Sequence, residues 1–107
     1  MSKLSREKGK RFERATVNWL KSLGYKARRL APMQAGSPED YPDVRAWNEC
    51  RVLEIECCHA KKVNWRRKFA QMLAQRRNGG MGLCRLKDDK CDPVWIVPES
   101  VMMELLR

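Results

Sequence analysis

The hydrophobic positions near the N-terminus recur at helical spacing, which predicts a helix over residues 5–23. The predicted apolar stripe consists of Phe12, Ala15, Trp19, Leu20 and Leu23. Gly24 follows, at a position where helices commonly stop. Glu13 is adjacent to Phe12. It therefore lies at the edge of the stripe, where its carboxylate can face a cleft.

The remaining pattern predicts short strands and two further helices. Strands are expected over residues 25–30, 43–47, 51–58, 81–86 and 93–97, with a tight hairpin connection at Asn48 and Glu49. Residues 31–42 and 87–92 contain turn formers and are expected to be loops. A helix is predicted over residues 64–77, capped by Asn64, and a shorter one over residues 99–106. The apolar face of the former consists of Trp65, Phe69, Met72 and Leu73.

This order of elements predicts an α/β fold in which a mixed central sheet is flanked by helices. The chain has 107 residues, a length typical of one domain. We therefore expect a single domain over residues 1–107.

Two carboxylates fall on one face of the strand predicted over residues 51–58. Side chains alternate between the faces of a strand, so Glu54, Glu56 and Cys58 share one face. Leu53, Ile55 and Cys57 share the other. Two such carboxylates repel one another and are costly to bury, and a metal ion offsets that repulsion. The alternative is an edge strand whose glutamates face solvent.

Asp43 begins the preceding predicted strand. Counting outward from the hairpin places Asp43 near Glu56 or Cys57, so the carboxylates of Asp43 and Glu56 can meet across the strand pair. A few carboxylates with open positions suit Mg²⁺ or Mn²⁺, which prefer oxygen ligands and keep bound waters.

The charge balance indicates a polyanionic partner. There are 23 Lys and Arg against 13 Asp and Glu, for a net charge of +10 and a pI near 9.8. The basic residues gather in two stretches, residues 3–29 and 61–77, and such clusters are typical of nucleic-acid binding. A membrane surface is disfavoured because the basic helices also supply the apolar stripes that a core would use. No apolar run is long enough to span a membrane. The basic N-terminus precedes no apolar segment, so it is not expected to be a signal peptide.

The five cysteines suggest a second, weaker interpretation. They show no regular spacing, which is not typical of a disulfide framework and favours reduced thiols. With His59 they offer soft ligands for zinc, but the chain has no Cys-x-x-Cys pair, and Cys57 and Cys58 point to opposite strand faces. A nucleophilic Cys58 would have only its neighbour His59 as base, and neighbours in an extended chain point apart.

Several of these segments resemble the PD-(D/E)XK nucleases, in particular small phage and bacterial proteins similar to Holliday-junction resolvases. The resemblance extends over residues 9–106. The opening Gly-Lys-Arg-Phe-Glu ending at Glu13 resembles the first helix of the family, and Pro42-Asp43 resembles its Pro-Asp motif. Residues 55–65 resemble its Glu-x-Lys region, and residues 93–98 resemble its closing strand.

The resemblance implies a restriction-endonuclease-like fold and a divalent metal held by Glu13, Asp43 and Glu56. Glu54 would extend the acidic site or bind a second ion. Gln71 falls where such proteins often have a glutamine that faces the site. The implied activity is metal-dependent cleavage of DNA, selective for branched or junction structures. The implied location is the cytoplasm of a bacterial or phage-infected cell.

One position departs from the family pattern, because Cys58 stands where the family has its catalytic lysine. An alternative register with Glu54 at the glutamate position also supplies no lysine. Lys61 or Lys62 could replace it from the following loop, the metal alone could suffice, or the protein could bind DNA without cutting it.

The basic side chains are expected to contact the DNA backbone, which gives affinity but no sequence preference. The candidates are Lys3, Lys10, Arg11, Arg14, Arg66, Arg67, Arg76 and Arg77. A homodimer is compatible with substrates that offer two scissile strands.

Overall fold

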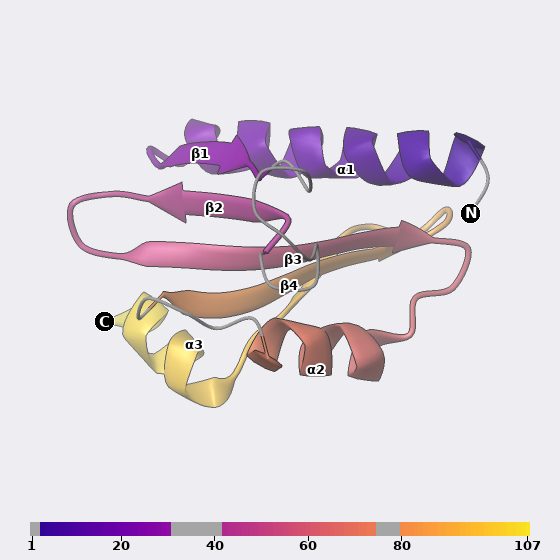
Figure 1. The fold of residues 1–107 in the computed structure, drawn as a ribbon. Coiled ribbons are helices and arrows are strands. Elements are labelled where there is room, and N and C mark those ends of the chain that lie inside the picture. Colours follow the sequence, from indigo (N-terminus) through magenta and orange to yellow (C-terminus); the bar gives the residue numbers. More distant parts are fainter. Residues whose placement is uncertain (1–2, 31–41, 75–79) are drawn as a thin grey trace.

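A computed structural model describes residues 3–30, 42–74 and 80–107. These residues form one five-stranded sheet and three helices (Figure 1). The elements are α1 (Lys3–Ser22), β1 (Lys26–Arg29), β2 (Val44–Trp47), β3 (Val52–Ala60), α2 (Trp65–Ala74), β4 (Met81–Asp88), β5 (Val94–Ile96) and α3 (Glu99–Leu106). No helix in the described ranges is long and apolar enough to cross a membrane.

The sheet has the order β1-β2-β3-β4-β5, and β3 lies at its centre. Only β3 and β4 run parallel, and the other neighbours are antiparallel. Parallel neighbours need a crossover connection, and α2 lies in that connection, on the side of the sheet opposite α1 (Figure 1). The predicted α/β fold, with a mixed sheet flanked by helices, is confirmed.

Side chains of β3 and β4 alternate between two separate cores. Leu53, Ile55 and Cys57 pack into the larger core under α1, together with Leu83 of β4. Cys84 and Leu86 of β4 form the smaller core with Met72 of α2. Glu54 and Glu56 are only 4% and 2% exposed. They lie on a central strand, which excludes the alternative of a solvent-facing edge strand.

The buried face of α1 is rotated relative to the predicted stripe. The buried residues are Phe12, Thr16, Val17 and Leu20, whereas Ala15 is exposed and Trp19 and Leu23 are 44% and 56% exposed. The Trp19 ring packs against the ring of Trp95 in β5, at a centroid distance of 5.4 Å. A polar Thr16 can be buried because its hydroxyl donates to the Phe12 carbonyl oxygen at 2.8 Å.

The hairpin between β2 and β3 is longer than predicted. It spans residues 48–51, and the Asn48 side-chain oxygen accepts hydrogen bonds from the backbone N–H groups of Cys50 and Arg51. The register is nevertheless the expected one, because Val44 pairs with Ile55 and Trp47 with Val52. Asp43, one residue before β2, is thereby opposite Glu56.

The other boundaries differ from the predictions by a few residues. β3 and β4 extend to Ala60 and Asp88, because their parallel pairing continues to that point. Asn64 caps α2 as predicted, by accepting a hydrogen bond from the Arg67 N–H at 3.2 Å. The last helix has the predicted bounds. The predicted loop over residues 31–42, apart from Pro42, lies outside the described residues, as do Arg76 and Arg77.

Candidate active site

Asp43, which directly precedes β2, and Glu56 of β3 form a carboxylate pair, in which Glu56 is buried and Asp43 is half-buried. The Asp43 carboxylate also accepts a hydrogen bond from the Cys57 N–H at 2.9 Å, which holds Asp43 against β3. Burial, and then the negative charge of Asp43, raise the pKa of Glu56 to about 9. Two acidic groups so placed cannot both ionise without a nearby positive charge.

Glu13 approaches the pair from α1. It follows the buried Phe12 and lies on the same helix face as Thr16, Val17 and Leu20, so the rotated face of α1 turns it toward the sheet. Its pKa is raised by burial and by the charge of Asp43. Its Oε1 accepts a hydrogen bond from Arg29 Nε at 3.0 Å. Glu13 therefore lies near Asp43 and Glu56, as predicted. Its carboxylate is also hydrogen-bonded to Arg29 of β1.

The pair suits a divalent cation. The Oε2 atom of Glu56 is buried and has no hydrogen-bond partner among the described residues, and a bound cation would satisfy it. No group of three or more His, Cys, Asp or Glu side chains in the described ranges is arranged to hold a metal ion. Mg²⁺ needs only one or two carboxylates, because it keeps several waters and binds substrate phosphates. Asp43 and Glu56 provide two.

Glu54 has different neighbours from those expected. Its cross-strand partner is Arg45, whose Nη2 donates to Glu54 Oε2 at 3.1 Å. On the other side it packs against Gly80, so closely that a Cβ there would lie 2.6 Å from Glu54 Oε1. Glu54 is thus held in an ion pair with Arg45, in contrast to the expectation that it extends the acidic site.

The lysine nearest the pair is not the one that the sequence suggested. Lys61 and Lys62 are exposed in the bend after β3. Glu56 is separated from Ala60, the end of that strand, by about 13 Å of extended chain. Lys68 of α2 instead places its Nζ 3.9 Å from Glu56 Oε1. The structure thus brings Lys68, and not Lys61 or Lys62, to Glu56.

Cys58 and Gln71 border this region. Cys58 is half-buried two residues beyond Glu56 on the same face of β3, and burial raises the pKa of its thiol. Gln71 is half-buried on α2, one helical turn after Lys68, and residues three apart in a helix lie on the same side.

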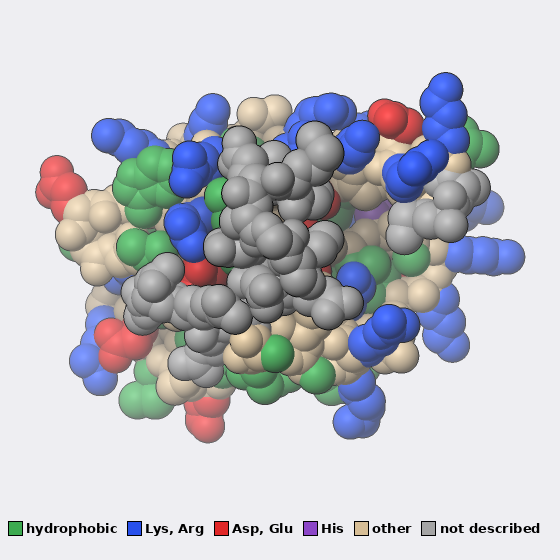
Figure 2. All heavy atoms as spheres, in the orientation of Figure 1, with side chains coloured by type: hydrophobic (Ala, Val, Ile, Leu, Met, Phe, Trp, Pro, Cys, Tyr) green, Lys and Arg blue, Asp and Glu red, His purple; other side chains and the backbone are tan. Residues whose placement is uncertain are grey.

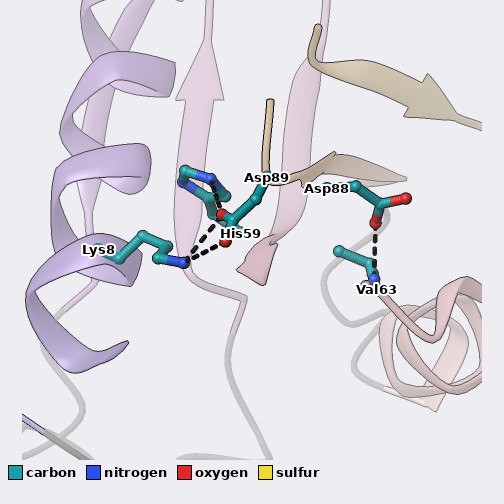
Figure 3. A network of polar contacts seen from close by, with 5 residues as sticks. All are labelled: Lys8, His59, Val63, Asp88 and Asp89. Carbon is teal, nitrogen blue, oxygen red and sulfur yellow. Dashed lines mark hydrogen bonds and ion pairs between the residues drawn. The ribbon is translucent and has the colours of Figure 1, made fainter. Parts of the chain in front are cut away.

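A polar network at the far end of β3 joins α1 to β4 (Figure 3). Lys8 of α1 donates to both oxygens of Asp89, at 2.9 and 3.0 Å, and His59 Nε2 lies 3.0 Å from Asp89 Oδ1. Burial lowers the pKa of His59, so near neutral pH the imidazole is uncharged and Lys8 supplies the positive charge. Next to it, Asp88 accepts from the Val63 N–H at 2.7 Å, which fixes the chain entering α2. His59 is therefore part of a structural junction at the edge of the site.

The free cysteines give no support to the zinc interpretation. Cys57 is buried under α1, whereas Cys84 is in the core under α2, and Cys50 and Cys91 are exposed. In the described ranges no three of these thiols, alone or with His59, come together in a group that could hold zinc.

The basic candidates are exposed on both outer helices. Lys3, Lys10, Arg11 and Arg14 project from α1, and Arg66 and Arg67 from α2. Arg66 stacks over the Trp65 ring at 4.8 Å. Figure 2 shows Lys and Arg side chains gathered along the edges of one face of the molecule.

Lys68 and Arg29 are the site residues that the sequence interpretation missed. The predicted apolar face of α2 included Trp65 and Leu73, which are 44% and 41% exposed. Met72 is the buried residue of α2, and Lys68 precedes it by four positions. That spacing was the available signal, because residues four apart lie on one helix face.

Comparisons with known proteins identify the family and the fold. The family model described as archaeal Holliday junction resolvase (hjc) matches residues 4–101. Among solved structures, the chain is similar to Archaeoglobus fulgidus Hjc, a Holliday junction resolvase from an archaeal hyperthermophile, with a TM-score of 0.64 and 26% sequence identity. The match covers 90% of this chain and 75% of that one. A search of curated proteins gives no significant match.

The matched segment contains α1 apart from Lys3, Asp43 and the whole of β3, so it includes every carboxylate described above. The resemblance to the PD-(D/E)XK nucleases is confirmed, since Hjc belongs to that superfamily. The protein is a member of the archaeal Holliday junction resolvase family of endonucleases.

Proposed function

We propose that this protein is a metal-dependent endonuclease that hydrolyses phosphodiester bonds in branched DNA such as a four-way junction. The observation that supports this most directly is the Asp43–Glu56 pair of a resolvase fold, in which Glu56 is buried on the central strand. Nucleases of this family generally depend on metal, and a pair of acids that repel one another suits a cation.

In this proposal Asp43 and Glu56 bind Mg²⁺ or Mn²⁺ directly, and Glu13 contributes through a bound water. When bound, the ion would polarise a phosphoryl oxygen and acidify a coordinated water. Asp43 is held for this role by the Cys57 N–H, and Arg29 orients Glu13.

The reaction is a hydrolysis. The oxygen of a water forms a bond to phosphorus while one ester P–O bond breaks. The released oxygen ends as an alcohol and the other strand end as a phosphate monoester. Gln71, on the same face of α2 as Lys68, would orient the attacking water or a phosphate oxygen.

The exposed basic side chains would hold the DNA backbone. Arg11 and Arg14 on α1 and Arg66 and Arg67 on α2 lie on opposite sides of the sheet, so a branched substrate can contact both helices. A homodimer would bring two such centres to the two scissile strands of a junction.

The alternative is a relative that binds DNA without cutting it. Cys58 favours this alternative, because an uncharged thiol cannot replace the charge of the family lysine. Metal-dependent cleavage distinguishes the two functions.

The test is cleavage of end-labelled four-way junction, flap and duplex DNA in Mg²⁺, Mn²⁺ or a chelator. The variants are Asp43→Asn, which can still accept the hydrogen bond from Cys57, and Cys58→Lys. We expect the unaltered protein to cut the junction only with metal, and Asp43→Asn to bind but not cut it. If only Cys58→Lys cuts, the protein is a binding relative. If none cuts under any of these conditions, the catalytic assignment is wrong.

A further inference from the structure

We propose that Lys68, which projects from α2, supplies to the Asp43–Glu56 pair the positive charge that β3 lacks at Cys58. This inference rests on the proposed nuclease function and names a further catalytic residue for it. The charge would come from the helix that crosses over the sheet, and not from the strand that carries the glutamate.

The position of Lys68 follows from how α2 sits on the sheet. Lys68 is in the first turn of α2, where its N–H donates to the Asn64 carbonyl oxygen at 3.2 Å. Its own carbonyl oxygen accepts a hydrogen bond from the Cys84 thiol, with an Sγ–O distance of 3.6 Å. Cys84 is the partner of Glu56 in the pairing of β3 with β4. The backbone at Lys68 is therefore fixed beside the residue pair that contains Glu56.

The side chain of Lys68 is directed at the acidic pair and is partly shielded from water. Its Nζ lies 3.9 Å from Glu56 Oε1, and the Lys68 side chain is only 28% exposed. The two basic side chains that precede it on α2, Arg66 and Arg67, are exposed. Lys68 is thus the basic group of α2 that the described structure places in contact with a site carboxylate.

Position 58 lies on the side of the sheet from which Lys68 approaches. Cys58 follows Glu56 by two residues, so both side chains point to the same face of β3. Cys58 packs against the smaller core, which contains Met72 of α2, and Lys68 precedes Met72 by one helical turn.

The small side chain of Cys58 is compatible with this arrangement. A lysine at position 58 would bring a second cation beside Lys68, and two like charges in a partly buried space repel. A short, uncharged thiol leaves that space to Lys68. In the reaction, the ammonium group of Lys68 would donate hydrogen bonds to the attacking water or to a phosphate oxygen as negative charge develops there.

The test compares Lys68→Met, Lys68→Arg, the double variant Lys68→Met/Cys58→Lys and the double variant Lys61→Met/Lys62→Met with the unaltered protein. Lys21→Met, which removes an exposed charge from the last turn of α1, is the charge-matched control. Single-turnover junction cleavage in Mg²⁺ gives the rate. Gel shift in a chelator gives junction affinity, and calorimetry gives Mg²⁺ affinity, so binding is measured apart from activity.

We expect Lys68→Met to lower the cleavage rate by about 100-fold or more, the usual effect of removing one group that stabilises transition-state charge. Its Mg²⁺ affinity should not fall, because a positive charge has been removed from beside Glu56. Lys68→Arg should retain more activity than Lys68→Met, and adding Cys58→Lys to Lys68→Met should restore at least a tenth of the lost rate.

The inference is overturned if Lys68→Met cuts as fast as Lys21→Met, or if the Lys61/Lys62 variant loses activity in its place. It is also overturned if neither arginine at position 68 nor lysine at position 58 restores the rate in folded, junction-binding protein, because Lys68 would then have only a structural role. In all these cases the unaltered protein still cuts and the nuclease function stands. If the unaltered protein itself does not cut, the proposed function fails first and Lys68 has no catalytic role.

Discussion

Glu54 and Glu56 lie on the same face of β3 and are almost equally hidden from solvent, but their neighbours differ. Glu54 has the guanidinium of Arg45 at 3.1 Å, which neutralises it. Glu56 has Asp43 beside it and the ammonium group of Lys68 at 3.9 Å. Glu54 is therefore part of a buried ion pair, whereas Glu56 lies beside a second carboxylate, and a metal ion can balance the charge of both when they are ionised.

The first prediction concerns the pH dependence of stability through Glu56. Its pKa is raised from 4.5 to about 9 in the folded, metal-free protein, by burial and by Asp43. Between these values the folded protein keeps a proton that the unfolded chain releases, so the free energy of unfolding falls as pH rises. Urea unfolding at a series of pH values, with a chelator present, measures this free energy. We expect it to fall with pH in the unaltered protein and to fall much less in Glu56→Gln.

Glu49→Gln, in the exposed hairpin after β2, is the control and should retain the pH dependence. Mg²⁺ should restore stability most strongly at the upper end of the range, because metal binding requires the deprotonated carboxylate. Equal slopes for the unaltered protein and Glu56→Gln would contradict the raised pKa.

At the scale of elements, the start of β4 depends on the packing of β3. Gly80 directly precedes β4 and contacts Glu54, whose carboxylate is held by Arg45. A Cβ on Gly80 would approach Glu54 Oε1, Cγ and Cδ at 2.6, 2.8 and 2.9 Å. Because Glu54 is buried and paired, it cannot move aside without loss of its ion pair.

Gly80→Ala should therefore destabilise the protein by about 1–3 kcal/mol, the usual cost of overpacking. Gly9→Ala is the matched control, since a Cβ there meets nothing within 4 Å. In a helix interior alanine is favoured over glycine by about 1 kcal/mol, so Gly9→Ala should stabilise. Urea unfolding measures both, and a neutral Gly80→Ala would show that Glu54 is not confined.

At the scale of the whole molecule, the chain has a net charge of +10, and α1 and α2, on opposite sides of the sheet, both carry exposed basic side chains. In the acidic pair Glu56 is buried and Asp43 is half-buried, so the pair contributes little to the outer surface. A polyanion therefore meets a basic exterior around a small negative centre. This distribution favours backbone contacts that are independent of base sequence.

The double variant Arg66→Ala/Arg67→Ala should bind a four-way junction more weakly, because two exposed positive charges of α2 are lost. The slope of log affinity against log salt should decrease by about 1–2 if both side chains contact phosphates. Fluorescence anisotropy over a series of salt concentrations measures this slope. Lys21→Ala, which removes one charge, is the control, and an equal change per charge removed in both variants would assign the effect to net charge alone.

Local periodicity alone determined a large part of this structure. Alternation along β3 assigned Glu54 and Glu56 to the same face, and counting back through the hairpin placed Asp43 opposite Glu56. That placement agrees with the four-residue connection over residues 48–51, in which Trp47 pairs with Val52. A two-residue turn at Asn48 and Glu49 would instead have paired Asp43 with Glu54. The cap at Asn64 and the bounds of α3 were also predicted correctly, because both depend on residues that are neighbours in the sequence.

Tertiary packing decided the rest. Which face of α1 is buried depends on the sheet beneath it, and that choice turned Glu13 inward and left Trp19 at the edge. Arg45 reached Glu54, and Lys68 reached Glu56, only because β2 and α2 lie against β3. Periodicity reports which residues share a face, but contacts between elements depend on how those faces dock. The sequence by itself therefore identified the acidic pair, and only the folded chain showed which cation lies beside it.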